Sequence, residues 1–203
     1  ELGGSARYNF SDRDAGSTSY SERFLQTGNS YSNSNSKNRS KNTNFNADFR
    51  LEWKPDTLTN IIFRPNFSYG KSNGYSISES GTFSEDPFNI SSNPNAYLNQ
   101  IFWESADDPF EKIRVNASNS ESSSKSNSLS ANASLQLNRR LNNRGRNITF
   151  RGMFGYGDNY SESLSEALTR YFDNAAGKTN DDRSQYTTTP TTNYNYTAEL
   201  TYN

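Results

Sequence analysis

The chain has 203 residues and a formal net charge of −1; only 30% of its residues are hydrophobic, but 14% are aromatic. The near-zero charge gives no electrostatic footprint for nucleic acid, and the absence of His and Cys excludes disulfides, the usual zinc sites and His-dependent nucleophiles. No apolar run reaches the ~18 residues of a transmembrane helix. Ser and Asn dominate whole segments, as in disordered chains, but disordered chains avoid aromatic residues.

The chain is predicted to form long strands that run up and down. Apolar and polar residues alternate with period two, which places successive side chains on opposite faces of a strand. The clearest case is a pair of alternating runs on either side of a short turn at Pro55 and Asp56. The predicted strands span residues of about 2–12, 32–53, 60–84, 113–138, 147–168 and 186–203.

The predicted connections differ in length at the two ends of the strands. Residues 12–16 have the composition of a turn. The Ser- and Asn-rich residues 32–43 have two interpretations, a disordered tract or a polar continuation of the following strand into water. Short turns are expected at 54–59 and 138–147, and long loops at about 13–30, 85–111 and 171–185. This asymmetry is typical of barrels with short periplasmic turns and long extracellular loops.

These patterns predict an all-β protein, an antiparallel up-and-down transmembrane β-barrel. Each alternating run has about the ten residues that a tilted strand needs to cross a bilayer. The smallest single-chain barrels have about eight strands, and lipid does not tolerate open sheet edges. We therefore expect residues 1–203 to be about six long strands of a larger barrel. Pro65 lies inside a predicted strand and lacks an N–H group, which predicts a β-bulge there.

One face of the predicted strands is apolar. Its aromatic residues gather near the strand ends, where Tyr and Trp rings suit the interfaces of a membrane. The residues predicted to face lipid are Phe45, Phe49, Leu51, Trp53, Phe63, Phe67, Tyr69, Leu135, Phe150, Phe154, Tyr156, Tyr194 and Tyr196.

The opposite face is polar and is predicted to line the barrel lumen. Its side chains have two open interpretations, a wall that contacts solute or plug, or a lattice of cross-strand hydrogen bonds and ion pairs. The residues predicted to face the lumen are Arg7, Asp48, Arg50, Glu52, Arg64, Gln136, Arg151 and Glu199.

The turn at Pro55 allows two registers for its hairpin. Placing Trp53 opposite Ile61 sets Arg50 opposite Arg64, and like charges that face each other are destabilising. A register shifted by two residues sets Glu52 opposite Arg64 instead. We therefore expect the shifted register.

Two segments resemble a known family. NADFRLEWKPDT at 46–57 followed by TNIIFRP at 59–65, and NRRL at 138–141 followed by GRNIT at 145–149, are similar to the outer-membrane β-barrel protein family of Bacteroidota. Members of that family are similar to TonB-dependent receptors, and such relatives carry an N-terminal carboxypeptidase-regulatory-like domain, a plug and a large barrel. The resemblance implies a bacterial outer-membrane location and a role in solute uptake or capture at the cell surface. It carries no functional residues over to this chain.

Sequence candidates for binding lie in the predicted loops. The aromatic residues Tyr97, Phe102 and Trp103 are predicted to form a ligand platform or to pack within their own loop, and both remain open. The loop carboxylates are predicted to be solvated, and no metal site or cofactor is expected. The expected partners are membrane lipid and lipopolysaccharide, the remaining barrel and plug, and a surface lipoprotein or another outer-membrane protein; nucleic acid is not expected.

Three functions remain open from the sequence. The first is the receptor-like barrel segment for solute uptake or capture. The second is a non-transporting outer-membrane scaffold or adhesin that acts through its extracellular loops. The third is a soluble β-sandwich binding module, which would not sort aromatic residues to strand ends. An enzyme is not expected.

Overall fold

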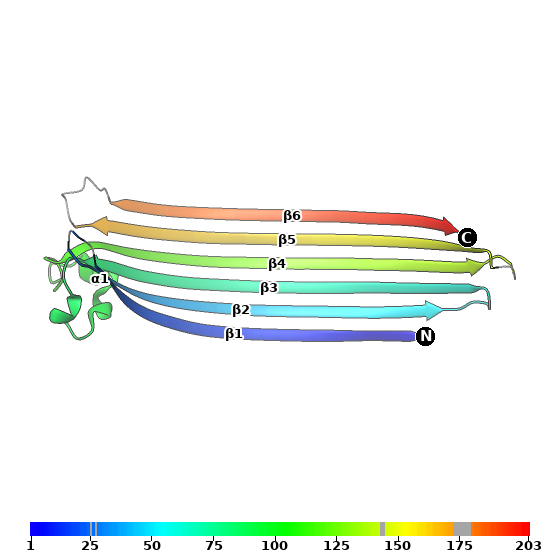
Figure 1. Ribbon diagram of the computed structural model, residues 1–203, viewed down its shortest axis with the longest axis horizontal. Coiled ribbons are helices and arrows are strands. Elements are labelled where there is room, and N and C mark those ends of the chain that lie inside the picture. Colours follow the sequence, from blue (N-terminus) through cyan, green and yellow to red (C-terminus); the bar gives the residue numbers. More distant parts are fainter. Residues whose placement is uncertain (25, 27, 143–144, 173–179) are drawn as a thin grey trace.

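Six long strands lie side by side in one antiparallel sheet, in the order β1 to β6 (Figure 1). The computed structural model describes residues 1–203 except 25, 27, 143–144 and 173–179. The strands are β1 (Leu2–Arg23), β2 (Ser30–Trp53), β3 (Thr59–Phe83), β4 (Arg114–Arg140), β5 (Asn147–Tyr171) and β6 (Asp181–Tyr202). The predicted all-β, up-and-down architecture is confirmed. The sheet is open, since β1 and β6 each pair with one strand in the described part of the chain.

The two ends of the sheet differ as the sequence predicts. Both termini and the short connections β2–β3 and β4–β5 lie at one end (Figure 1). The opposite end carries the long segment between β3 and β4, called the cap here (residues 84–113). The cap contains η1 (Pro87–Asn89), η2 (Pro94–Tyr97) and α1 (Gln100–Trp103). Among the described residues no helix has the length and apolar character needed to span a bilayer.

The polar tracts are strands, not loops. The turn expected at residues 12–16 and the loop expected at 13–30 are wrong over most of their length, because β1 continues to Arg23 and pairs with β2 throughout. Asp12 lies 3.2 Å from the Nζ of Lys41 and 3.3 Å from Nη2 of Arg39. Cross-strand ion pairs and hydroxyl hydrogen bonds thus sustain the ladder without apolar burial. The interpretation of residues 32–43 as a continued strand is confirmed.

The last long loop is also shorter than expected. It was predicted at 171–185, but β6 already begins at Asp181 and pairs there with Thr169 of β5. Residues 173–179 of that prediction lie outside the described residues. The loop expected at about 85–111 is confirmed, since β3 ends at Phe83 and β4 begins at Arg114.

Pro65 interrupts one ladder without a bulge, so the predicted bulge is wrong. The pairing of β2 with β3 stops after Asp48↔Asn66 and resumes at Leu51↔Phe63 in the same register. In antiparallel strands alternate residues direct their N–H and C=O groups to opposite neighbours. The backbone of Leu58 accepts from Arg140 of β4, so odd-numbered residues of β3, including Pro65, point to β2. The missing N–H therefore costs a ladder bond to β2 only.

The hairpin adopts the register that the sequence disfavoured. Trp53 pairs with Ile61, and the register shifted by two residues, with Glu52 opposite Arg64, is wrong. The like-charge problem is relieved within β2, because Arg50 Nη2 donates to Glu52 Oε2 at 2.9 Å. Residues i and i+2 of one strand share a face, so an ion pair within β2 offsets like charges across the two strands.

The main buried core is formed by the cap and the end of β3. Phe83, Leu98, Phe110 and Ile113 form one cluster. Arg114 is buried beside them and makes a double ion pair with Asp108, Nε to Oδ2 at 2.8 Å and Nη2 to Oδ1 at 2.9 Å. The guanidinium also lies 5.2 Å from the ring of Phe83, a cation–π distance. The cap is therefore an ordered unit fixed to the sheet.

Candidate functional site: two faces of one sheet

The strand register divides the sheet into two chemically distinct faces. We call face A the side that carries Phe49 and Leu51 of β2, and face B the side that carries Asp48 and Arg50. Since paired residues share a face, the register extends each assignment across all strands. We call the near half the part toward the short turns (residues 2–7, 46–53, 61–68, 130–137, 150–157 and 193–200), and the far half the strand residues toward the cap.

Face A of the near half is apolar in every strand. One row across the sheet reads Leu2, Leu51, Phe63, Leu135, Gly152 and Ala198, and the next toward the cap reads Gly4, Phe49, Pro65, Ala133, Phe154 and Tyr196. All residues predicted to face lipid lie on this face, either in the near half or in the first row beyond it. Nothing in the described chain covers them: Tyr196 is 86% exposed and Trp53 is 58% exposed.

Face B of the near half carries the charged residues predicted to face the lumen. Arg151 pairs with Glu199 on one side and with Gln136 on the other, and Glu52 belongs to the same row. Asn66 donates from Nδ2 to Asp48 Oδ1 at 2.6 Å. The register thus brings together side chains that are far apart in the sequence, in line with the predicted cross-strand lattice.

The cap lies over face A of the far half. Asn95 exchanges hydrogen bonds with β2, accepting from Asn33 at 2.6 Å and donating to Asn35 at 3.1 Å. Asn99 donates to Glu79 of β3 at 2.7 Å. Odd-numbered residues of β2 and β3 belong to face A, so the cap rests on the same side as the apolar rows. Face B is left uncovered over its whole length in the described residues.

The three predicted loop aromatics have different environments. Trp103 is buried, and its Nε1 donates to the backbone oxygen of Leu98 at 2.9 Å. Tyr97 is half-buried and contacts the rings of Phe102 and Phe110 edge-on. Only Phe102 offers substantial surface, at 40% exposure. Packing within the cap accounts for Trp103 and most of Tyr97, and their predicted binding role stays a prediction.

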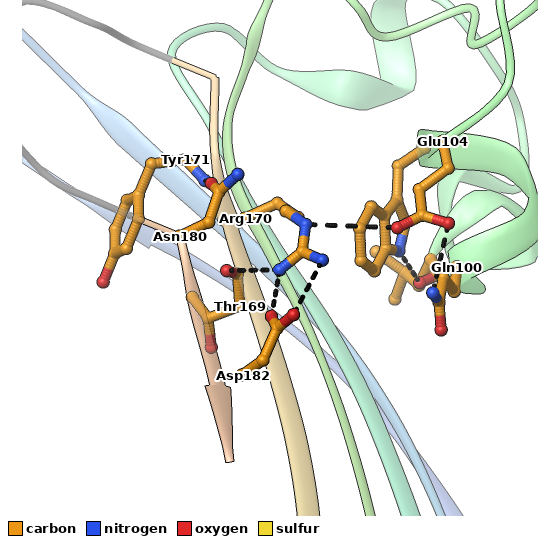
Figure 2. Close-up of polar contacts among 9 residues, drawn as sticks. Gln100, Glu104, Thr169, Arg170, Tyr171, Asn180 and Asp182 are labelled. Carbon is orange, nitrogen blue, oxygen red and sulfur yellow. Dashed lines mark hydrogen bonds and ion pairs between the residues drawn. The ribbon is translucent and has the colours of Figure 1, made fainter.

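A charged network joins the cap to the last hairpin (Figure 2). Arg170 of β5 donates to both carboxylate oxygens of Asp182 of β6, and its Nε lies 4.0 Å from Glu104 Oε1. Gln100 of α1 donates to the other oxygen of Glu104 at 3.1 Å. The hydrogen bond from Arg170 lowers the pKa of Asp182 below its ordinary value of 3.8. Asp182 therefore remains ionised in mildly acidic solution and ties β6 to β5.

An open pocket of about 340 Å³ lies beside this network. Glu121, Glu166 and Asp182 line it with a single cation, Arg183, so it disfavours anionic ligands. Asp182 was one of the predicted loop carboxylates, expected to be solvated, but it is bonded to Arg170. That contact was not predicted, because it depends on the β5–β6 register. No cluster of three or more metal-ligating side chains occurs in the part of the chain that the structure describes.

Comparison with known proteins gives only remote structural likeness. No protein-family model matches the chain, and no curated protein matches it significantly. The ferric yersiniabactin uptake receptor of Yersinia pestis is similar over 85% of this chain and 25% of its own, with 8% identity and a TM-score of 0.28. A siderophore receptor of Acinetobacter baumannii is similar over 98% of this chain and 43% of its own, with 7% identity and a TM-score of 0.17.

A different kind of membrane protein gives similar values. The membrane pore complex of pneumolysin is similar over 97% of this chain and 31% of its own, with 7% identity and a TM-score of 0.17. The chain thus spans less than half the length of each of these proteins. Likeness at this level establishes no shared family and no shared activity, and the resemblance to the Bacteroidota family stays a prediction.

Proposed function

We propose that the chain is a segment of an outer-membrane β-barrel in a TonB-dependent-receptor-like protein, which takes up or captures solute at the bacterial cell surface. One observation carries the proposal: an uncovered apolar face that continues in register through all strands, opposite a charged face. From Ile61 to Tyr69 a strand advances roughly 27 Å, or about 21 Å in height at a tilt of about 40°. This is comparable to the apolar band of outer-membrane barrels, about 25 Å tall.

The open edges of β1 and β6 are part of the proposal. Lipid offers no hydrogen bonds to a free sheet edge, so further strands must pair with both edges before the sheet can enter a membrane. Face A would then contact lipid in the near half, and the cap would stand outside the barrel wall beyond the membrane, where lipopolysaccharide or a surface protein is within reach. Face B would line the lumen.

The first experiment is a test of barrel formation in the full-length protein. We expect it to require detergent and to migrate differently on a gel before and after heating, because closed barrels resist unheated denaturant. A water-soluble monomer without this shift would contradict the proposal and favour the β-sandwich, in which face A packs against a second sheet.

An adhesin or scaffold remains the second candidate, and the ordered cap favours it. The buried ion pair of Arg114 with Asp108 fixes the cap rigidly, as a presenting surface requires. Uptake and adhesion differ in what happens to a bound solute. Proteoliposomes that accumulate labelled solute on energisation would favour uptake, whereas cell binding lost on deleting residues 85–111 would favour adhesion.

A further inference from the structure

In the four central strands, β2 to β5, face B of the far half carries almost only hydroxyl and amide groups. Its residues in β2 to β5 alternate with those of face A, and none of them is charged. They are Ser30, Ser32, Ser34, Ser36, Asn38, Ser40, Asn42 and Asn44 of β2; Gly70, Ser72, Gly74, Ser76, Ser78, Ser80 and Thr82 of β3; Asn116, Ser118, Ser120, Ser122, Ser124, Ser126 and Ser128 of β4; and Asn159, Ser161, Ser163, Ser165, Ala167, Thr169 and Tyr171 of β5. β6 continues the surface with Gln185, Thr187, Thr189 and Thr191. The described charged residues of this part of face B lie only in the two edge strands, Arg13 and Arg23 in β1 and the ion pair of Arg183 with Asp181 in β6.

The hydroxyl groups of this surface are within hydrogen-bonding distance across the strands. Ser17 and Ser36 are 2.8 Å apart at their oxygens, and Ser76 and Ser122 are 3.3 Å apart. Ser72 donates to Asn42 Oδ1 at 2.7 Å. Each hydroxyl has one donor and two acceptor sites and rotates freely, so these groups can exchange partners among themselves, water and a ligand.

The composition of the surface restricts what can bind to it. Over β2 to β5 a charged ligand would lose hydration without gaining a counter-charge, and an apolar ligand would cover hydroxyl groups that it cannot satisfy. A neutral ligand rich in hydroxyl groups can replace each hydrogen bond between the surface and water with one between the surface and the ligand. The near half of face B differs sharply, because Arg50, Arg64 and Arg151 face the same side there.

The spacing of the groups favours a repeating ligand. Neighbouring strands are about 4.8 Å apart, and residues on one face recur roughly every 6.7 Å along a strand. Many near-equivalent positions follow one another without a unique pocket. Such a lattice binds each unit of a polymer weakly and lets it move from one position to the next.

We propose that the far half of face B, over β2 to β5, is a weak, extended binding surface for neutral oligosaccharides. This inference rests on the proposed barrel, in which face B lines the lumen, and it names the class of solute for that lumen. The cap does not obstruct the surface, since the cap lies on face A.

The test compares three hexasaccharides on the full-length protein in detergent. The probes are maltohexaose, a galacturonic acid hexamer and a glucosamine hexamer, which are neutral, anionic and cationic. Binding is measured by saturation-transfer NMR and equilibrium dialysis. We expect maltohexaose to bind with millimolar affinity and at least about threefold more tightly than either charged probe, the ratio that one net hydrogen bond supplies.

Two neighbouring serines of β4 provide matched variants. Ser124 lies on face B opposite Gly74, which leaves room for a larger side chain, and Ser123 lies on face A. Ser124→Asp should weaken maltohexaose binding about threefold or more, and Ser123→Asp should leave it unchanged.

The outcomes separate this inference from the proposed barrel. Heat-modifiable mobility reports the barrel without any sugar. A heat-modifiable protein that binds no maltohexaose, or that binds all three probes equally, overturns the neutral-glycan surface alone. Loss of assembly in Ser124→Asp but not in Ser123→Asp would show that face B packs against protein, and this also overturns it. A full-length protein whose gel mobility does not change on heating would contradict the proposed barrel itself.

Discussion

In the near half of the sheet the charged side chains of β2 to β5 lie on face B, whereas in the far half those of the same strands lie on face A. Arg50 and Arg64 exemplify the first group, and Arg39 and Glu162 the second. The backbone ladder continues through both halves, so hydrogen bonding within the sheet does not cause the exchange. The exchange is what the proposed barrel requires, in which face A meets an apolar medium in the near half and water in the far half.

The largest loss of stability is expected in the cap, which supplies the buried core of the far half. Arg114→Met should leave the buried Asp108 carboxylate unpaired and destabilise the cap by about 3–5 kcal/mol. Hydrogen exchange should then accelerate in residues 84–113 and not in residues 129–137 of β4. Replacing both partners by apolar residues should restore much of the protection. Equal acceleration in the two regions would show that the halves fold as one unit.

The next effect tests the near half. Leu51→Arg should damage membrane assembly at a cost of about 2–4 kcal/mol if it lies near the bilayer midplane. Asn132→Arg, on face B of the near half in the row of Asp48, should be tolerated. The measurement is the heat-modifiable fraction after refolding into lipid vesicles. Equal tolerance at both positions would contradict the lipid assignment of face A.

A smaller effect is expected at the break in the β2–β3 ladder. Pro65→Ala supplies the missing N–H group, which points toward β2 opposite residue 49. We expect a new, slowly exchanging amide at position 65 and a gain of about 0.5–1.5 kcal/mol from the bond. An amide at position 65 that exchanges as fast as those of the turn at 54–58 would show that another constraint opens the ladder here.

The smallest effect concerns the link between β5 and β6. The pKa of Asp182 is lowered in the folded protein, so its contribution to stability is present above its ordinary value of 3.8 and is lost as pH falls through the lower, folded value. Acidification below about pH 4 should therefore reduce the exchange protection of residues 181–185, after correction for intrinsic rates. Asp182→Asn should lose this pH dependence. A pH profile unchanged by that substitution would assign the transition to another carboxylate.

The alternation of apolar and polar residues predicted the strands and their faces better than amino-acid composition did. Where apolar and polar residues alternate, as from Phe45 to Trp53, strand type and face follow directly from the sequence. Where Ser and Asn occupy both faces, composition alone does not separate strand from loop, and β1 beyond Asp12 was missed for that reason. Its pairing depends on ion pairs with Lys41 and Arg39, which are contributed by another strand.

The register and the cap depended on information that the sequence does not show. The Trp53↔Ile61 register was rejected on a like-charge argument, but Arg50 turns to Glu52 of its own strand. The aromatic residues of residues 84–113 were evident, yet which of them are buried depends on the Arg114–Asp108 pair, whose members lie on different elements. The candidate lipid and lumen residues were assigned from alternation alone, and the register places each set on one face.

The repeated serines of the far half also allow its strands to change length without disturbing the near half. Sliding one strand past another by two residues there sets Ser against Ser again, so this region scarcely distinguishes one alignment from the next. The dissimilar residues of the near half and the cap must therefore fix the alignment for both. Removing a dipeptide from every strand at one level, such as 76–77 and 121–122 together with the residues that pair with them, would preserve every apolar row and lower the cap by roughly 7 Å. In the proposed barrel, the distance between the cap and the membrane is thus adjustable in fixed increments, independently of the apolar rows of the near half.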